Sequence, residues 1–243
     1  MTYCVGLLVR EGLVMVSDTR TNAGVDQIST YSKISVWERP GDRVFCLMSA
    51  GNLAISQELV SLIQEDMATA EHNLMTVPNM FRAAQTVGKT VRAVYSIAGR
   101  ELEAQSADFS ISLLLGGQIK GEPPRMFLIY AAGNFIESSV ETPFLQLGEH
   151  KYGKPILDRA MTFETRLRSA LKLALISMDS TLRSNLSVGL PIDVFVYRTD
   201  ELEVALRKRI DEREGYFAGL REQWSNALRE AYRGIKDPDW FQG

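Results

Sequence analysis

The first 18 residues, MTYCVGLLVREGLVMVSD, hold the pattern that decides the fold. Two apolar runs, Tyr3–Val9 and Leu13–Asp18, flank the polar segment Arg10-Glu11-Gly12. Apolar runs of this length that are joined by a short turn containing glycine predict a β-hairpin. The chain is therefore expected to begin with two antiparallel strands, and the residue that precedes the first of them is Thr2.

A second hairpin and two helices are expected next. The runs Lys33–Trp37 and Arg43–Ser49 are separated by the turn sequence Pro40-Gly41-Asp42. The hydrophobic period then lengthens to three or four residues, which predicts helices. The first helical face consists of Leu53, Ile55, Leu59, Val60, Leu62, Ile63 and Met67, after Asn52 in the N-cap position. The second helix is expected from about Pro78 to Ile97.

The rest of the chain repeats this alternation of strand groups and helix pairs. Strands are expected at Phe109–Leu115, Met126–Ala132 and Phe144–Leu147, helices at Tyr152–Ala160 and Glu164–Leu182, and a last strand at Ile192–Tyr197. Strands and helices that are segregated into groups favour a layered α+β domain over a repeated βαβ unit. Two sheets packed together, with the helix pairs outside, would bury every apolar face.

The last forty residues or so have a different character. We expect one domain over residues 1–200 and a helical extension over 201–243, with a charged amphipathic helix between Leu202 and Ile235 that is interrupted near Gly215 and Gly219. Its apolar stripe consists of Phe217, Leu220, Trp224, Leu228, Ala231 and Ile235. A complete domain has little core left for this stripe, so the stripe must either fold back over an outer helix or dock on a neighbouring subunit. Of the two, we expect docking on a neighbour.

Composition excludes several classes of function. The net charge is −3 with no basic block, which argues against a nucleic-acid partner. No apolar stretch is long enough to span a bilayer, and the start of the chain lacks the features of a signal peptide. Cys4 and Cys46 are read as buried thiols in a reducing cytoplasm. His72 and His150 have no metal-ligand spacing, so neither a metal nor another cofactor is expected.

The candidate chemistry begins at Thr2, directly after Met1. Removal of that methionine would leave an α-amine and a hydroxyl on one residue, and the amine can act as the base for its own hydroxyl. Asp18 ends the second strand and Lys33 opens the third. A carboxylate that holds the lysine would place a positive charge beside the amine and lower the pKa of that amine. Each residue alone is more often a structural feature.

Gly51 lies at the junction between a strand and the first helix, in Ser49-Ala50-Gly51. A glycine N–H in this position can face a developing oxyanion, and the N-terminus of the helix that follows adds to the positive potential.

These motifs, in this order, resemble the proteasome β-subunits, and the bacterial two-component heat-shock protease subunit has the same order. The chain is most similar to the bacterial proteasome relatives called Anbu, the ancestral β-subunits. The segments that carry this resemblance are Met1–Gly6, Arg20–Asp26, Gly148–Leu157 and Ser184–Pro191. The resemblance implies a four-layer αββα N-terminal-nucleophile hydrolase sandwich and a homo-oligomer, either a ring or an open spiral.

The resemblance also implies roles for single residues. Thr2 is the nucleophile, Asp18 and Lys33 complete the triad, and Gly51 supplies the oxyanion N–H. Two further proteasome positions, an Asp and a Ser, map to Asp179 and Ser187. This chain departs from the family pattern at Glu149, where proteasome β-subunits carry serine. A carboxylate near the α-amine would stabilise its protonated form and weaken it as a base.

Three functions stay open at this level. The leading one is a self-compartmentalising threonine peptidase. The second is an assembly component of the same fold whose site is weak or blocked, which Glu149 and a retained Met1 both favour. The third is an N-terminal-nucleophile amidase or acyl transferase that acts on a small substrate. The sequence identifies neither the substrate nor an ATPase partner.

Overall fold

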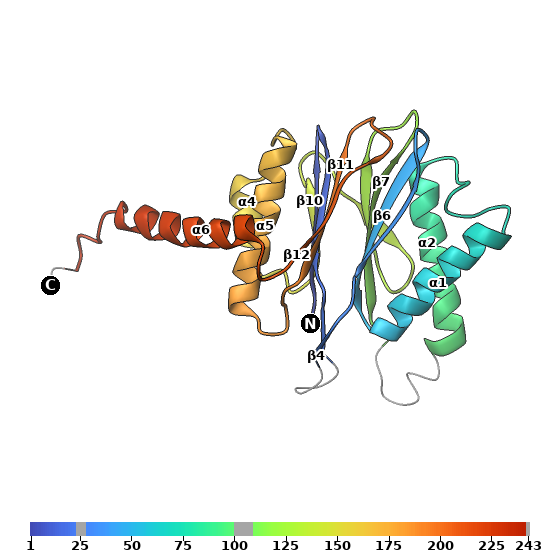
Figure 1. Ribbon diagram of the computed structural model, residues 1–243, viewed down its shortest axis with the longest axis horizontal. Coiled ribbons are helices and arrows are strands. Elements are labelled where there is room, and N and C mark those ends of the chain that lie inside the picture. The colour runs from blue at the N-terminus through green and yellow to red at the C-terminus, as the bar shows by residue number, and fades with distance from the viewer. Residues whose placement is uncertain (23–27, 100–108, 242–243) are drawn as a thin grey trace.

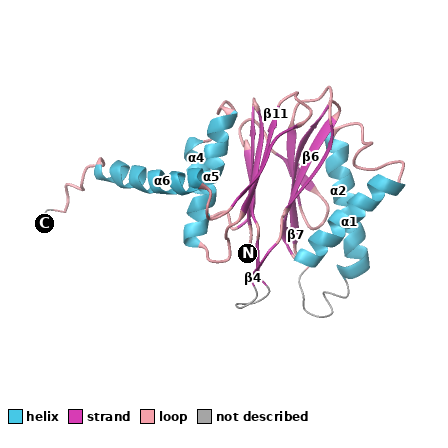
Figure 2. Ribbon diagram, viewed as in Figure 1, coloured by secondary structure: helices cyan, strands magenta, loops and turns pink. Residues whose placement is uncertain are grey.

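The computed structural model describes residues 1–22, 28–99 and 109–241. Part of the Arg20–Asp26 segment therefore lies outside the described residues. Within them, the chain forms two five-stranded sheets that lie face to face, with a pair of helices on each outer side (Figure 1). Figure 2 shows the resulting order of layers, which is helix, sheet, sheet, helix. The expected four-layer αββα architecture is confirmed.

The first sheet contains the start of the chain in its interior. Its strand order is β10-β1-β2-β11-β12. The bounds are β1 Tyr3–Val9, β2 Gly12–Asp18, β10 Phe144–Gly148, β11 Ile192–Arg198 and β12 Val204–Ile210. Every residue of β1 and β2 is buried, because one face packs on helices and the other packs on the second sheet. The residue before β1 is thus held between two neighbouring strands.

The second sheet has the order β5-β6-β7-β8-β9, and all its neighbours are antiparallel. The bounds are β5 Ile34–Arg39, β6 Arg43–Gly51, β7 Ile111–Ile119, β8 Arg125–Ile129 and β9 Phe135–Glu137. A short two-stranded ladder, β3 Arg20–Asn22 with β4 Ile28–Thr30, lies between the first hairpin and β5. The two predicted hairpins are both present.

Two helix pairs cover the sheets. Helices α1 (Leu53–Thr69) and α2 (Met80–Val94) pack on the second sheet, and α2 continues into a π-helical turn, η1 (Tyr95–Gly99). Helices α4 (Lys154–Ala160) and α5 (Leu167–Ser184) pack on the first. The side chain of Asn52 caps α1 by accepting from the backbone N–H groups of Ala54 and Ile55, as its position predicts. The described helices include none that is long and apolar enough to cross a membrane.

The end of the chain differs from the expected continuous helix. Val204–Ile210 forms β12, which pairs with β11 at the edge of the first sheet, so the domain continues past residue 200. The helix α6 begins only at Gly215 and runs to Arg233 without a break at Gly219. Figure 1 shows α6 extending away from the body of the molecule. The helical extension is therefore shorter than the sequence suggested.

Candidate active site

Thr2 is fixed by the backbone on both sides of the chain start. The N–H of Tyr3 donates to Oδ1 of Asp18 at 3.0 Å, and the carbonyl oxygen of Thr2 accepts from the N–H of Glu149 at 2.8 Å. Strand β1 then pairs with β10 from Tyr3 and Gly148 onward. Thr2 itself is half-buried, so its side chain stands at the mouth of the sandwich and not in the core.

The buried phenol of Tyr3 also holds the start of β1 in place, through two hydrogen bonds. Its hydroxyl forms a hydrogen bond of 2.6 Å with Oγ of Ser177 on α5, and it accepts another of 2.6 Å from Nε2 of Gln146 on β10. Burial raises the pKa of the Tyr3 phenol to about 12, so it stays neutral at physiological pH. Three elements therefore meet at the residue that follows Thr2.

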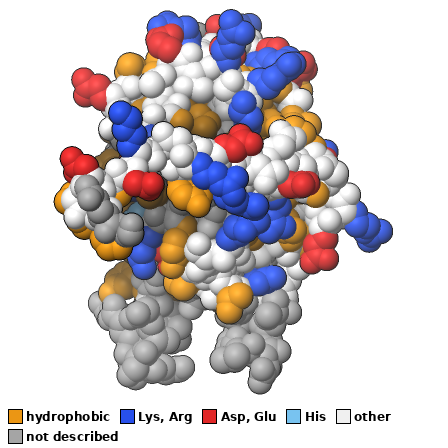
Figure 3. Space-filling view, turned by 90° about the vertical axis from the view of Figure 1, so that its left-hand side faces the viewer, with side chains coloured by type: hydrophobic (Ala, Val, Ile, Leu, Met, Phe, Trp, Pro, Cys, Tyr) orange, Lys and Arg blue, Asp and Glu red, His pale blue; other side chains and the backbone are white. Residues whose placement is uncertain are grey.

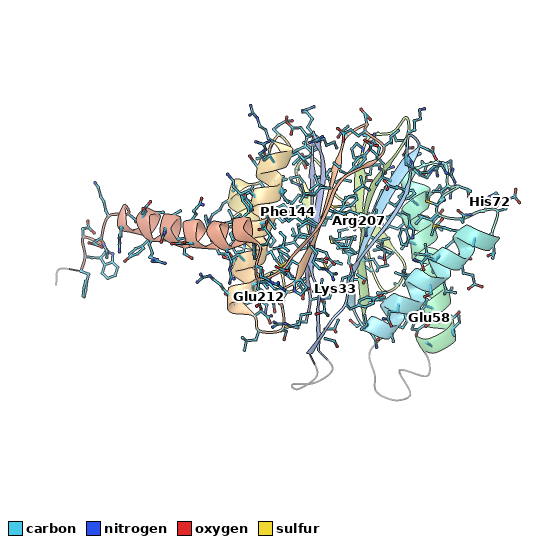
Figure 4. All side chains as sticks on the ribbon, in the orientation of Figure 1. Lys33, Glu58, His72, Phe144, Arg207 and Glu212 are labelled. Carbon is cyan, nitrogen blue, oxygen red and sulfur yellow. The ribbon has the colours of Figure 1, made fainter. Side chains whose placement is uncertain are left out.

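Asp18 and Lys33 form a buried ion pair beside this point. The ammonium Nζ of Lys33 donates to Oδ1 of Asp18 at 2.6 Å and to the carbonyl oxygen of Arg20 at 2.9 Å. The side chain of Lys33 is 6% exposed and that of Asp18 is 0% exposed. Burial raises the pKa of the Asp18 carboxyl, and the neighbouring Lys33 charge opposes that shift. Figure 4 shows Lys33 between the two sheets, toward the end of the molecule where the chain begins.

Gly51 closes β6 in a conformation that only glycine adopts easily. Its φ is +116°, and a Cβ atom there would lie 2.1 Å from the carbonyl oxygen of Ser110. Helix α1 begins two residues later, so its N-terminal amides add positive potential at this end of the sheet. Gly51, Thr2 and Lys33 line one cavity of about 670 Å³. The structure thus brings these predicted residues together, with Asp18 bonded directly to one of them.

Glu149 lines the same cavity and is 7% exposed. Its Oε2 accepts from Nδ2 of Asn185 at 3.2 Å, and its Oε1 lies 3.6 Å from Nζ of Lys151. Nδ2 of Asn185 also lies 4.0 Å from Sδ of Met1. Asn185 was not among the predicted site residues. Its only signal was its place directly after a predicted helix, within the segment Ser184–Pro191.

Asp179 and Ser187 lie apart from this cluster. Asp179 is a fully buried residue of α5, and its Oδ1 accepts from Nε of Arg221 on α6 at 2.6 Å. Ser187 lies in the loop after α5, where its backbone N–H donates to Oδ1 of Asn185 at 2.9 Å. Neither residue lines the cavity that contains Thr2. The residue of this region that reaches the site is Asn185.

The two cysteines are buried free thiols, and burial raises the pKa of each well above its usual value. Such thiols stay protonated at neutral pH and are poor nucleophiles. Within the described residues, no group of three or more His, Cys, Asp or Glu side chains is placed to hold a metal ion. Among these groups, the Thr2 hydroxyl is therefore the candidate nucleophile that faces the cavity.

Comparison with solved structures extends the likeness to the whole chain. Anbu from Yersinia bercovieri is 46% identical, with a TM-score of 0.93 over 99% of this chain and 100% of that one. An Anbu (Gly-1) mutant from Hyphomicrobium sp. strain MC1 is 52% identical, with a TM-score of 0.92 over 98% and 100%. The chain belongs to the Anbu family.

Two further proteins are similar to this chain. The helical assembly of the Anbu complex from Pseudomonas aeruginosa contains a chain that is 45% identical, with a TM-score of 0.93 over 99% of this chain and 100% of that one. A curated proteasome subunit beta from Haloquadratum walsbyi is 22% identical over 212 residues, which are 87% of this chain and 79% of that protein. No protein-family model matches the chain. The chain is thus more similar to these Anbu structures than to the curated proteasome subunit beta.

Proposed function

We propose that this Anbu chain is an N-terminal threonine hydrolase of the threonine endopeptidase class, with Thr2 as its nucleophile once the Met1–Thr2 bond is cleaved. The observation that carries the proposal is the single cavity that Thr2, Lys33 and Gly51 line, with Lys33 held by Asp18 at 2.6 Å. A hydroxyl, a fixed cation and a backbone N–H from residues that line one cavity are the parts that amide hydrolysis needs.

The proposed reaction proceeds in two steps. The Thr2 hydroxyl oxygen attacks the carbonyl carbon of the substrate while its proton moves to the Thr2 α-amine. The N–H of Gly51 stabilises the oxyanion, the C–N bond breaks, and the proton passes from the α-amine to the leaving nitrogen. Water then hydrolyses the ester on Thr2, with the amine again as the base. Lys33 lowers the pKa of this amine, and Asp18 keeps the Lys33 ammonium in place.

A second candidate function is an assembly component whose catalysis is blocked. As long as Met1 stays bonded to Thr2, the nitrogen of Thr2 is an amide that cannot act as a base. Glu149 adds a buried carboxylate to the cavity, and this charge favours the protonated form of a freed amine. The position of Glu149 favours the second candidate, and the state of the N-terminus separates the two functions.

We also propose that the chain acts as a homo-oligomer in the cytoplasm. The Pseudomonas aeruginosa relative is described as a helical assembly, and α6 of this chain carries exposed large apolar side chains. Figure 3 shows the molecule from the side on which α6 extends. Hydrophobic side chains lie there among charged ones. The buried free thiols Cys4 and Cys46 fit a reducing compartment.

The deciding experiment combines the intact mass of the purified protein with covalent labelling. We expect a mass that lacks Met1 and the addition of one β-lactone or epoxyketone per chain at Thr2. A panel of peptides and small amides then separates a peptidase from a small-substrate amidase. A free Thr2 that no threonine-directed electrophile modifies would contradict the hydrolase and support the assembly component.

A further inference from the structure

A second cavity lies at the open edge of the sandwich, where β5 of one sheet and β12 of the other are both edge strands. The two edges are tied together at one point, because the backbone N–H of Val204 donates to Oε2 of Glu38 at 3.1 Å. The cavity has a volume of about 370 Å³ and shares no lining residue with the cavity that contains Thr2. Its walls include Ser32, Ile34, Asp193, Phe195, Arg207 and Arg209.

The side chain of Arg207 lies on the face of β12 that is turned toward the second sheet. Arg207 pairs with Phe195 in the register of β12 and β11, and paired residues share a face of the sheet. Phe195 belongs to the core cluster between the sheets, so Arg207 faces that side as well (Figure 4). Burial raises the pKa of the Cys46 thiol on β6, and the charge of Arg207 opposes this shift. The cation is therefore close enough to act on the interior of the sandwich.

The charges of this cavity do not balance. Arg209 is held by Asp193, whose two carboxylate oxygens accept from its Nε at 2.7 Å and from its Nη2 at 2.8 Å. Lys208, which also lines the cavity, donates to Oε1 of Glu214 at 2.7 Å. Arg207 makes neither a hydrogen bond nor an ion pair with any residue that the structure describes. The cavity thus contains one positive charge that its described neighbours leave uncompensated.

The chemistry of the cavity fits a carboxylate better than a phosphate. A guanidinium presents two parallel N–H donors at the spacing of the two carboxylate oxygens. One uncompensated charge matches a monoanion, and the carboxylate of Asp193 repels the second negative charge of a phosphate dianion. The volume exceeds what a carboxylate alone requires, and the partly buried Ile34 supplies an apolar wall for the group that carries it. The cavity therefore matches an organic acid with an apolar part.

We propose that this cavity binds a small carboxylic acid that carries an apolar group, with Arg207 as the residue that holds the carboxylate. The site is separate from the candidate active site, so the inference and the proposed hydrolase can fail independently. The two cavities are joined through the chain, because Ser32 donates to Oδ2 of Asp193 at 2.8 Å and directly precedes Lys33. A bound acid therefore lies beside the segment that carries Lys33 into the candidate active site.

The test measures the binding of N-acetylleucine to the full chain by isothermal titration calorimetry. N-acetylleucinamide, which has the same shape without the negative charge, and inorganic phosphate are the comparison probes. We expect the acid to bind with a Kd of about 1 mM, the affinity that one charge-assisted contact with little apolar burial supports. The amide should show no binding, and phosphate should bind more weakly than the acid.

Arg207→Gln is expected to weaken binding of the acid about ten-fold or more, because it removes the charged partner of the carboxylate. Arg207→Lys keeps the charge but loses the planar pair of donors, so its affinity should lie between those of Arg207→Gln and the unmodified chain. Arg198→Gln is the matched control and should leave the Kd unchanged. Arg198 is an exposed residue of the neighbouring strand β11, pairs with Glu201 and does not line the cavity.

Four results would each overturn the inference: no binding of the acid, equal binding of the acid and the amide, tighter binding of phosphate, or equal Kd values for Arg207→Gln and the unmodified chain. Light scattering tests another occupant, a carboxylate of a neighbouring subunit. We expect Arg207→Gln to keep the oligomer mass of the unmodified chain. A lower mass would assign Arg207 to a contact between subunits and would overturn the small-acid site.

Discussion

The backbone N–H of Glu149 donates a hydrogen bond of 2.8 Å to the carbonyl oxygen of Thr2. The segment that fixes the candidate nucleophile therefore also carries the carboxylate that departs from the proteasome pattern. The Glu149 side chain cannot move far from the cavity, because Asn185 holds its Oε2 and only 7% of the residue is exposed. The side chain of Glu149 is thus held at one place in the site.

Glu149→Ser is expected to accelerate labelling of a free Thr2 by a β-lactone below about pH 8, the ordinary pKa of an α-amine. Removal of the carboxylate lowers the pKa of the Thr2 amine, and a shift of one unit would give up to about ten-fold faster labelling. The measurement is the labelling rate between about pH 6 and 9. Glu141→Ser, an exposed position away from this cavity, is the control. Identical pH profiles for Glu149→Ser and the unmodified sequence would show that the carboxylate does not act on the amine.

Gly148→Ala is expected to disturb the chain start. The φ of Gly148 is +73°, and a Cβ atom there would lie 1.9 Å from the carbonyl oxygen of Thr2. Gly121 has a similar φ of +88°, but its Cβ would meet open space. Gly121→Ala should therefore lower the free energy of unfolding by only about 1 kcal/mol, and Gly148→Ala by about 2 kcal/mol or more with loss of labelling at Thr2. Equal effects in denaturant unfolding would refute this account.

Lys33→Ala is expected to remove activity and to make stability depend on pH. Loss of one partner from a buried pair costs about 3–5 kcal/mol, and both side chains are nearly inaccessible here. Burial already raises the pKa of Asp18, and without the lysine that pKa rises further. A folded-state pKa above the unfolded value means that the folded state binds the proton more tightly, so stability falls as pH rises between the two values.

The difference in melting temperature between the unmodified chain and Lys33→Ala should therefore be smallest near pH 4, about the unfolded carboxyl pKa. It should widen toward pH 8, once the pH exceeds the folded-state pKa of Asp18 in the unmodified chain. Lys151→Ala is a suitable control, because its side chain is 73% exposed. A difference that stays constant across this range would show that Asp18 does not titrate in the variant.

Much of this fold could be predicted from the sequence, because the spacing of apolar residues indicates which face of each strand or helix is buried. Strands β1 and β2 and helix α1 have strong patterns, and all three appear close to their expected bounds. Strand β12 was missed because five of its seven residues are exposed and read as a charged segment, so its pairing with β11 leaves no apolar alternation. Its pairing with β11, the strand directly before it, specifies it, and no apolar pattern within the segment records that contact.

The candidate site also contains residues that the sequence predicts and one that it does not. Thr2, Lys33 and Gly51 stand at the ends of strands, where a local motif and a topological position coincide. Asn185 reaches Glu149 across the turn after α5, a contact that no local spacing encodes. Asp179 was matched by residue type alone, and its partner, Arg221, belongs to a helix that the sequence placed outside the domain.

Thr2→Ala is expected to abolish hydrolysis and labelling while it changes the melting temperature by no more than about 2 °C, a small fraction of the shift that a core substitution causes. The side chain is half-buried at the chain start and has little packing to lose. Thr2→Ser keeps a hydroxyl and should keep part of the labelling. Turnover close to that of the unmodified chain in Thr2→Ala would exclude Thr2 as the nucleophile.

The last prediction concerns the exposed end of α6. The first two turns of this helix belong to the domain, because Phe217 and Leu220 are buried and Arg221 is bonded to Asp179. Beyond Trp224 the large apolar residues are exposed: Leu228 49%, Tyr232 64%, Ile235 73%, Trp240 82% and Phe241 72%. So much exposed apolar surface is unusual for a monomer. We therefore expect deletion of residues 228–243 to dissociate the homo-oligomer while the domain stays folded.

Size-exclusion chromatography with light scattering measures the outcome, and the melting temperature reports on the domain. The double variant Leu228→Ser with Tyr232→Ser should weaken assembly in the same way, since it removes apolar contact without shortening the chain. Arg229→Ser with Arg233→Ser changes two exposed polar residues of the same helical segment and should not. If the truncated chain keeps its full oligomer mass, the contacts between subunits lie elsewhere. If the full-length chain is a monomer at micromolar concentration, the self-compartmentalising peptidase fails as a whole, because no enclosed chamber can form around Thr2.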